Sequence, residues 1–423
     1  MIGGLHMHIV YAIREFEYNT THGGVISYVT NISEIFARHG HKISIVAISD
    51  KHRGSHFWKK NITIEYINLR DTFLGRQLLT YKESHTQYSC LIRIIEKVVR
   101  SYEINRRIKK LHKTDKIDLI QYASPTAIGL FRIRAIPTIV RISQDPTLWR
   151  ETEDPNYNMK SSMNRVSFED KLELAAIKRA DVVFAPSKLV AEIIEKRLGL
   201  NVSVIESPFN HNKNSFQYKN QKSILHDKNY FLYFGILSNR KAMLTIADIL
   251  ENVLRDYPNM YFVFAGENRE LELKDGRRIR AVKYLKEKAG KQKDRVIHFN
   301  GLKRESLYPI IERADICILP SRIDNLANSF IEAMALGKIV ISTYGSSAEQ
   351  LITQGVNGIL VKQESPRSLK NAIDFVMKMD KIKRNRIGIR AKESLQRLEP
   401  EMVYQKHLKF YLDLLKKRER PSL

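Results

Sequence analysis

Short apolar runs and longer amphipathic segments alternate along the first half of the chain. The runs at residues 6–13 (HMHIVYAI) and 42–48 (KISIVAI) have the length of strands. Between them, residues 25–40 carry apolar side chains at helical spacing and end at Gly40, a typical helix C-cap. Further apolar runs follow at residues 117–123, 137–143 and 181–187. Strands that alternate with helices predict a parallel sheet covered on both faces.

The pattern stops at residues 207–229, which are rich in Asn and Lys, and then restarts with a strand-length run at 229–235. An amphipathic helix and further apolar runs follow at residues 261–267, 295–301, 315–321 and 338–345. We therefore expect two Rossmann-like domains, residues 1–209 and 210–401, which face a cleft. Ligands of such sheets bind at the carboxyl ends of the strands.

Composition narrows the classes of partner. The 423 residues carry a net charge of +25, from 71 Lys and Arg against 46 Asp and Glu. Such a charge fits nucleic acid, an anionic membrane face or anionic small ligands. No interleaved aromatic and basic pattern or recognition-helix motif is present, so nucleic acid is not expected.

No leader-like segment or apolar run of about 20 residues is present, so a cytoplasmic location is expected. Cys90 and Cys317 stand in apolar sequence and are expected to be buried thiols.

Residues 320–337 (PSRIDNLANSFIEAMALG) carry the candidate chemistry. They leave an apolar strand, pass through a polar loop and enter a helix at about Asn328. Asp324 lies in the loop and Glu332 lies on the helix. Asn328 and Ser329 fall where a helix N-terminus offers free backbone N–H groups. The arrangement suits a ligand with phosphate at one end and hydroxyls at the other, as in a nucleotide sugar.

Other strand ends add candidates. Gly23 and Gly24 open the first long helix, where paired glycines allow close backbone approach to an anion; a tight turn alone also explains them. Arg240 and Lys241 follow a strand and suit a diphosphate, or form a solvated charge pair. Gly266 follows a further strand and is expected to line the same crevice.

An ordered set of motifs resembles the retaining GT-B glycosyltransferases of family 4. The segments in order are THGGVISYVTNISEIFARHGHKISIV, ADVVFAPSKLVAEII, YFGILSNRKAM, VIHFNGL, ADICILPSRIDNLANSFIEAMALGKIVIST and EQLITQGVNGILV. The resemblance is dense from about residue 230 to 362. The last helix, residues 402–423, resembles the helix that joins the first domain in that fold.

The resemblance implies roles for matched positions. Glu332 would bind the ribose hydroxyls, and Asp324 would face the donor sugar near the reacting carbon. Lys241, with Arg240, would neutralise the leaving diphosphate. The remaining donor-binding positions that we assign are Gly23, Gly24, Gly235, Gly266, Asn325, Ala327, Asn328 and Ser329.

Three positions depart from the family pattern. The family usually has Glu where this chain has Asp324, whose reach is shorter by about 1.5 Å, one C–C bond. It usually has Arg where this chain has Ile236. Many members have a histidine after the strand at 137–143, where this chain reads Ser143-Gln144-Asp145. Whether that triplet replaces the histidine is open at this point.

The expected activity is metal-independent sugar transfer with retention, from a nucleotide diphosphate sugar, most often UDP-linked in this family, to an acceptor hydroxyl. No metal or other cofactor is expected. The acceptor would be a glycan or lipid-linked glycan in O-antigen, capsule or other cell-surface polysaccharide assembly. Residues 88–113 combine an apolar face with many cations, which suits either a core-packed helix or contact with the inner face of an anionic membrane. The alternatives are an epimerase-like nucleotide-sugar enzyme and a catalytically weak, partner-dependent subunit.

Overall fold

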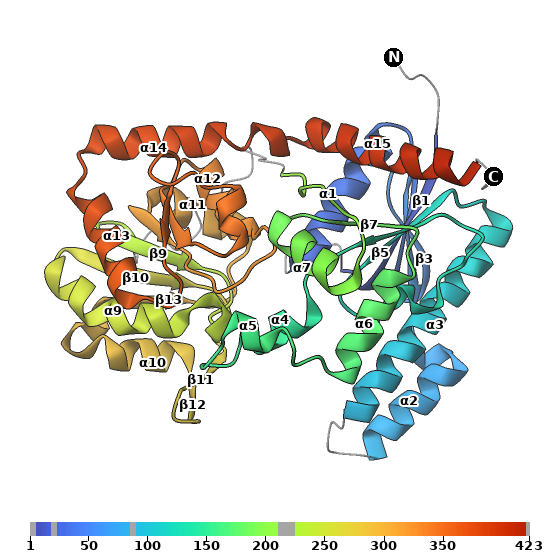
Figure 1. Cartoon of the computed structure of the whole chain (residues 1–423), viewed down its shortest axis with the longest axis horizontal. Coiled ribbons are helices and arrows are strands. Elements are labelled where there is room, and N and C mark those ends of the chain that lie inside the picture. The colour runs from blue at the N-terminus through green and yellow to red at the C-terminus, as the bar shows by residue number, and fades with distance from the viewer. Residues whose placement is uncertain (1–5, 18–22, 85–89, 210–224, 420–423) are drawn as a thin grey trace. The chain divides into compact units, whose positions relative to one another are not determined.

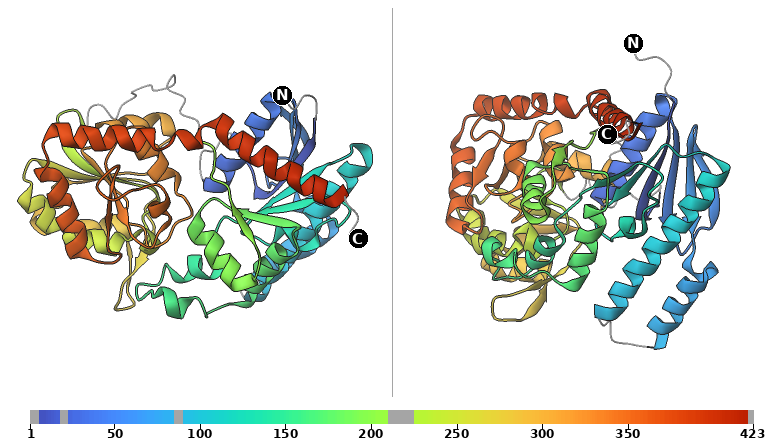
Figure 2. Two further views of the ribbon diagram at one scale, coloured as in Figure 1. Left: turned by 45° about the horizontal axis from the view of Figure 1, so that its top comes forward. Right: turned by 45° about the vertical axis from the view of Figure 1, so that its right-hand side comes forward.

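The computed structural model describes residues 6–17, 23–84, 90–209 and 225–419. Its contacts divide the chain into two compact units. Unit 1 comprises Met1–Thr147, Asn164–Phe209 and Leu398–Leu423, and unit 2 comprises Leu148–Met163 and Asn210–Arg397. Each unit is a sheet with helices packed on it (Figure 1, Figure 2).

The sheet of unit 1 has eight strands in the order β3-β4-β2-β1-β5-β6-β7-β8. In chain order the strands are β1 His8–Glu15, β2 Lys42–Ile48, β3 Gly54–Lys59, β4 Ile62–Ile67, β5 Leu119–Ala123, β6 Thr138–Arg141, β7 Val182–Ala185 and β8 Val202–Val204. All neighbouring strands are parallel except β3 and β4. The central strands are buried on both faces, which explains their continuous apolar runs.

Helices and short helical turns cover this sheet. They are α1 Gly24–Arg38, η1 Leu69–Asp71, α2 Phe73–Ser84, α3 Cys90–Thr114, η2 Ile128–Phe131, α6 Phe168–Lys178, α7 Lys188–Leu198 and α15 Pro400–Glu419. The α15 helix packs on α1: the Phe36 ring lies 4.9 Å from the ring of Tyr404 and 5.2 Å from that of Tyr411. The C-terminal helix therefore joins the first unit, as predicted.

Unit 2 is built on a six-stranded, wholly parallel sheet in the order β13-β10-β9-β14-β15-β16. The strands are β9 Asn229–Phe234, β10 Met260–Ala265, β13 Val296–Phe299, β14 Ile316–Ile318, β15 Val340–Thr343 and β16 Ile359–Val361. The helical elements are η4 Asn239–Lys241, α9 Met243–Asp256, α10 Ala281–Lys288, η5 Gly290–Arg295, α11 Arg304–Arg313, α12 Asn328–Ala335, η6 Ser347–Gln350, α13 Pro366–Lys378, α14 Lys381–Glu393 and η7 Gln396–Leu398. A separate antiparallel hairpin joins β11 Glu270–Glu272 to β12 Arg278–Arg280. The predicted fold class, two Rossmann-like parallel sheets with a returning C-terminal helix, is confirmed.

One segment departs from the predicted domain division. Residues 148–163, which include most of α4 (Pro146–Glu151) and all of α5 (Met159–Ser162), make their contacts in unit 2. The buried guanidinium of Arg322 donates to the carbonyl oxygens of Thr152 (3.0 Å) and Asp154 (2.5 Å). A buried arginine needs several acceptors, and this backbone supplies them. That requirement is invisible in the local sequence.

The two cysteines differ in exposure. Cys317 is buried in β14, as expected, and burial raises the pKa of its thiol to about 12. Cys90 begins α3 and is exposed, so that part of the prediction is wrong. The first turn of a helix exposes one side even when the sequence around it is apolar. The predicted helix at 88–113 corresponds to α3; residues 88 and 89 lie outside the described part.

Candidate functional site

Two glycines meet at the carboxyl ends of β9 and β10 in unit 2. Gly235 follows β9 with φ 127°, and its N–H donates to the Ala265 carbonyl (2.9 Å). A Cβ added at Gly266, which follows β10, would lie 1.9 Å from the Gly235 carbonyl oxygen. Gly266 is therefore required by backbone packing. The two predicted donor-site glycines shape this edge of the sheet.

The loop between β14 and α12 is tied down at several points. Its Arg322 N–H donates to the Arg240 carbonyl (2.9 Å), and its Leu326 N–H donates to the Ser347 hydroxyl (2.8 Å). Leu326 has φ 54°, the left-handed region that a leucine seldom adopts. Such strain persists where the surroundings fix the chain, and it recurs at ligand-binding loops. The loop thus holds Asp324 in a defined place.

Lys241 and Asp324 form a nearly buried ion pair with each other. Their side chains are 14% and 11% exposed. Burial lowers the pKa of Lys241, and the Asp324 carboxylate opposes that shift. The sequence predicts separate ligand contacts for the two residues, but the structure brings them together. A ligand phosphate that approaches Lys241 has to replace or share this carboxylate.

Arg240 points toward an acid that sequence analysis did not find. Its Nε lies 3.4 Å from Oε1 of Glu153, and its backbone N–H donates to Oε2 (3.1 Å). The Ser238 hydroxyl donates to the same carboxylate (3.0 Å). The guanidinium also stands 5.9 Å from the centre of the Trp149 ring. Glu153 lies 87 residues from Arg240, too far for any local pattern to reveal the pair.

Among the residues that the structure describes, no side chain caps the N-terminus of α12. Ala327 is the N-cap residue, and Asn328 and Ser329 form the first turn, so the helix begins where the sequence predicts. Uncapped N–H groups and the helix dipole favour an anion here. The neighbouring Asn325 N–H donates to its own loop at Oδ1 of Asp324 (3.1 Å).

Glu332 is a buried carboxylate one turn further along α12. Arg304 Nε lies 3.3 Å from its Oε1, and the Tyr308 hydroxyl donates to the same oxygen (3.2 Å). Burial raises the pKa of Glu332, and Arg304 opposes the shift. Neither partner of Glu332 was predicted from the sequence. Their i, i+4 spacing, which puts a cation and a hydroxyl on one face of α11, was the available signal.

The remaining predicted residues belong to unit 1 and lie outside its strands. Gly23 has φ 103° and precedes α1, and a Cβ at Gly23 or Gly24 would meet no atom of the described residues within 4 Å. At the place of the family histidine, Asp145 is fully buried and pairs with Arg197 (Nε to Oδ2, 2.8 Å). The described residues contain no group of three or more His, Cys, Asp or Glu side chains that could hold a metal.

No helix in the described ranges is both long and apolar enough to cross a bilayer.

Two family models match consecutive parts of the chain. The model of "Glycosyltransferase Family 4" matches residues 22–213, and that of "Glycosyl transferases group 1" matches residues 214–394.

Relatives and solved structures are similar over different lengths. An uncharacterized glycosyltransferase of Methanocaldococcus jannaschii is 26% identical over 210 residues, 46% of this chain and 49% of that protein, so the match spans about half of its length. Lipopolysaccharide 1,2-N-acetylglucosaminetransferase of Salmonella typhimurium is 24% identical over 263 residues, 60% of this chain and 67% of that protein. The crystal structure of Anabaena HepE in complex with UDP superposes with a TM-score of 0.65 at 15% identity, over 96% of this chain and 100% of that one. This last likeness shows the fold.

Proposed function

Because the chain belongs to the group 1, family 4 glycosyltransferases, a retaining family with the GT-B fold, we propose that it moves a sugar from a nucleotide diphosphate sugar to an acceptor hydroxyl with retention. One arrangement carries the proposal. The short helix α12 has an uncapped N-terminus and a buried carboxylate, Glu332, and the loop before it carries the Lys241–Asp324 pair. Phosphate suits the first feature and ribose hydroxyls suit the second.

The donor would be bound as follows. Glu332, oriented by Arg304 and Tyr308, accepts hydrogen bonds from the ribose hydroxyls. The N–H groups of residues 327–329 donate to phosphate oxygens, with Asn325 beside them. Gly235, Gly266 and the Arg240 backbone shape the floor. For Gly23 and Gly24 of unit 1, close backbone approach to the diphosphate stays a prediction from the sequence.

Lys241 would exchange partners when the donor binds. The diphosphate pairs with the ammonium group, and Asp324 is released to accept a hydrogen bond from a hydroxyl of the donor sugar. As the bond from the anomeric carbon to the diphosphate oxygen breaks, its electron pair goes to that oxygen, which Lys241 and the α12 dipole stabilise. The acceptor oxygen bonds to the anomeric carbon, and its proton passes to the leaving phosphate. No protein nucleophile is assigned.

Relatives guide the choice of substrates. The HepE structure holds UDP, which supports a UDP-sugar donor. The Salmonella relative is named as a lipopolysaccharide N-acetylglucosaminetransferase, which supports a glycan or lipid-linked glycan acceptor in cell-surface polysaccharide assembly. We therefore propose that the protein acts in the cytoplasm, at the inner face of the membrane.

The test of the donor site is a thermal-shift titration with UDP-, GDP- and ADP-sugars, each with magnesium and with EDTA. A donor at 100 times Kd adds about 2.7 kcal/mol of stability. We expect one nucleotide class to raise Tm equally under both conditions. Glu332→Gln should weaken that nucleotide by roughly tenfold or more, because a hydrogen bond to a charged group contributes about 1.5–3 kcal/mol.

The exposed Glu305→Gln on α11 is the matched control and should bind as the unmodified chain does. Equal affinity of Glu332→Gln would exclude the ribose role, and no shift with any nucleotide would contradict the donor site.

A partner-dependent, weakly active subunit is the second candidate. Two ion pairs favour it, Lys241–Asp324 and Arg197–Asp145, because each occupies charged groups that a ligand would otherwise contact. Incubation of the protein with a sugar-labelled donor and a membrane extract distinguishes transfer, an epimerase-like activity and a partner-dependent subunit. Label on an acceptor supports transfer, label retained on a changed nucleotide sugar indicates an epimerase-like enzyme, and an unchanged donor supports the partner-dependent candidate.

A further inference from the structure

Unit 1 carries a basic and apolar pocket beside its sheet. The pocket lies at the end of the strands opposite the end at which ligands bind in this kind of fold. The pocket has a volume of about 1030 Å³. Its lining residues are Leu130, Phe131, Arg132, Arg134, Leu172, Ala175, Lys178, Arg179 and Ala180. They precede β6 and β7 or lie on the helices beside them, so the pocket is at the amino-terminal ends of these strands. Ligands of Rossmann-like sheets bind at the carboxyl ends.

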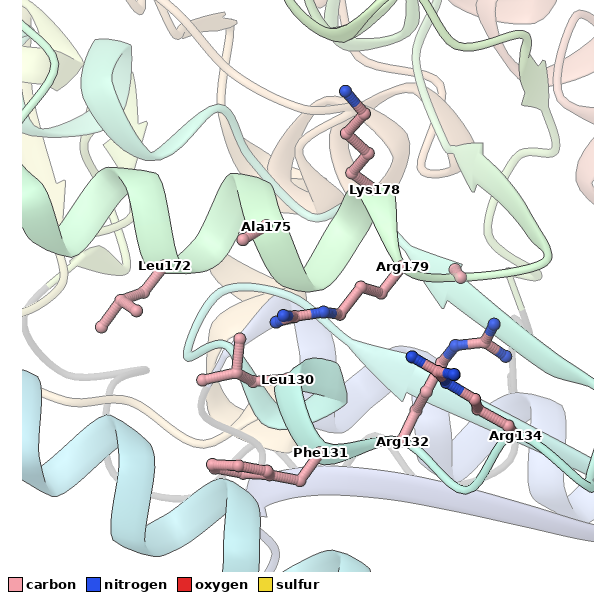
Figure 3. Close-up of a pocket in the computed structure, with 9 residues that line it drawn as sticks. Leu130, Phe131, Arg132, Arg134, Leu172, Ala175, Lys178 and Arg179 are labelled. Carbon is pink, nitrogen blue, oxygen red and sulfur yellow. The ribbon is translucent and has the colours of Figure 1, made fainter.

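The charges of this pocket are not balanced. Asp181, next to it, is shared by Arg132 (3.1 Å) and Arg418 (2.7 Å) and also accepts from Thr138. Arg134 and Arg179 form no ion pair with any residue that the structure describes. Figure 3 shows Arg132 and Arg134 side by side, with Arg179 extended between α6 and Leu130. No acidic residue is among those that line the pocket.

An exposed aromatic pair borders these cations. Phe131 is 45% exposed, and its ring meets that of Tyr102, 43% exposed, edge to face at 6.2 Å. Leu130 and Leu172 continue the apolar wall. Aromatic rings beside arginines match the headgroup layer of a bilayer, where rings enter the interface and guanidinium groups meet phosphate.

We propose that this pocket binds phosphate headgroups of an anionic bilayer and docks unit 1 on the membrane surface. Arg134 and Arg179 contact the lipid phosphates, while Phe131 enters the acyl boundary. A lipid-linked acceptor is a less suitable occupant, because the pocket is at the amino-terminal ends of the strands and transfer is expected at their carboxyl ends. The inference rests on the membrane location proposed above and is independent of the transfer chemistry.

The test is co-sedimentation of the full chain with vesicles of phosphatidylcholine, with and without phosphatidylglycerol. We expect binding only to the anionic vesicles, weakened by salt. The double variant Arg134→Glu/Arg179→Glu should lose about tenfold or more in partitioning, because each cation near such a surface contributes about 1 kcal/mol, roughly fivefold. Its thermal shift with nucleotide should not change, because neither arginine is among the donor-binding residues.

The matched control is Lys60→Glu/Arg70→Glu, which makes the same change in net charge in the exposed turns that flank β4, toward the far edge of the sheet. Equal losses of vesicle binding in both double variants would assign the binding to net charge and contradict the proposed role of the pocket. Unchanged binding of Arg134→Glu/Arg179→Glu would do the same, whereas failure of the unmodified chain to bind would remove the membrane location itself.

A second readout does not depend on charge. Phe131→Trp in a chain with Trp58→Phe and Trp149→Phe should be quenched by brominated lipid in anionic vesicles. No quenching would overturn the proposal. Complete competition by inorganic phosphate would reassign the pocket to a free anion, and equal competition by single-stranded RNA would reassign it to nucleic acid.

Discussion

The two units each bury a cation near the carboxyl end of a strand, but they treat its charge differently. In unit 2, Lys241 follows β9 and has a carboxylate partner, Asp324. In unit 1, Arg141 ends β6 and donates to the hydroxyls of Ser143 (2.7 Å) and Ser207 (3.1 Å). No described residue forms an ion pair with Arg141. Burial lowers the pKa of both cations, that of Arg141 to about 10.

The surroundings of Arg141 explain how an unpaired charge is tolerated. Its guanidinium carbon lies 4.1 Å from the centre of the Tyr28 ring, a cation–π contact. Tyr28 belongs to a buried polar network in which Gln121 Nε2 donates to its hydroxyl (3.1 Å) and the Tyr411 hydroxyl donates to Gln121 (2.7 Å). Unit 1 therefore spreads one charge over neutral groups, whereas unit 2 balances it at one carboxylate. Removal of one group should have very different consequences in the two units.

The largest effect is expected at the carboxylate of unit 2. Asp324→Ala leaves Lys241 buried and unpaired, and breaking a buried pair from one side costs about 3–5 kcal/mol. The chain has two tryptophans, Trp58 in unit 1 and Trp149 in unit 2. Urea unfolding of a Trp58→Phe chain, followed by Trp149 fluorescence, therefore reports on unit 2.

Two comparisons control this measurement. The double variant Lys241→Met/Asp324→Leu removes both charges and should recover most of the loss. Asp248→Ala breaks the exposed pair with Lys288 (3.6 Å) and should cost less than about 1 kcal/mol. If Asp324→Ala costs no more than Asp248→Ala, the ion pair does not stabilise unit 2.

The next effect is an acid sensitivity of unit 1. His407 Nδ1 donates to the Val403 carbonyl (3.0 Å), and its Nε2 accepts from the Tyr28 hydroxyl (2.9 Å), so the buried ring is neutral. His41 Nδ1 accepts from the Met7 N–H (3.1 Å) and is also neutral. Burial lowers the pKa of each to about 4, below the ordinary value of 6.5.

Proton uptake by these two histidines favours the unfolded chain in acid. The unfolded chain takes up these protons at a higher pH than the folded one, so the stabilisation is complete above pH 6.5 and is lost as pH falls toward 4. Each histidine contributes up to about 3 kcal/mol. Urea unfolding of a Trp149→Phe chain, followed by Trp58 at several pH values, should show this slope. His407→Gln should flatten it and the exposed His56→Gln should not; equal slopes in all three would contradict the assignment.

Several strands with continuous apolar runs were predicted from the sequence, whereas the edge strand β3, which has no such run, was not. The runs at 6–13 and 42–48 became β1 and β2, because strands buried on both faces are apolar throughout. The edge strand β3 (GSHFWK) is exposed along nearly its whole length and pairs antiparallel with β4. Its backbone hydrogen bonds require no apolar side chains, so hydrophobic periodicity could not reveal it.

The candidate site was predictable where it is local and hidden where it is not. Asp324, Asn328, Ser329 and Glu332 were placed on their loop and helix from consecutive residues. The partners of these groups come from distant segments, as with Lys241 and Asp324, 83 residues apart. Their pairing is set by the order of strands in the sheet, and no local pattern in one sequence encodes that order.

The smallest effect is expected at the unpaired cation, and it decides whether the contrast between the two units is real. Arg141→Met keeps the length of the side chain and removes a charge that no described acid pairs with. The loss of two hydrogen bonds and a cation–π contact is offset by the relief of burying the charge, so unit 1 should change by no more than about 1 kcal/mol. Trp58 fluorescence during urea unfolding of a Trp149→Phe chain measures this change.

Arg141→Lys keeps the charge but cannot donate to both Ser143 and Ser207 as the guanidinium does. It should therefore destabilise unit 1 more than Arg141→Met does. A loss of about 3 kcal/mol in Arg141→Met would mean that the charge of Arg141 is balanced within unit 1 after all, and that the two units handle their buried cations alike.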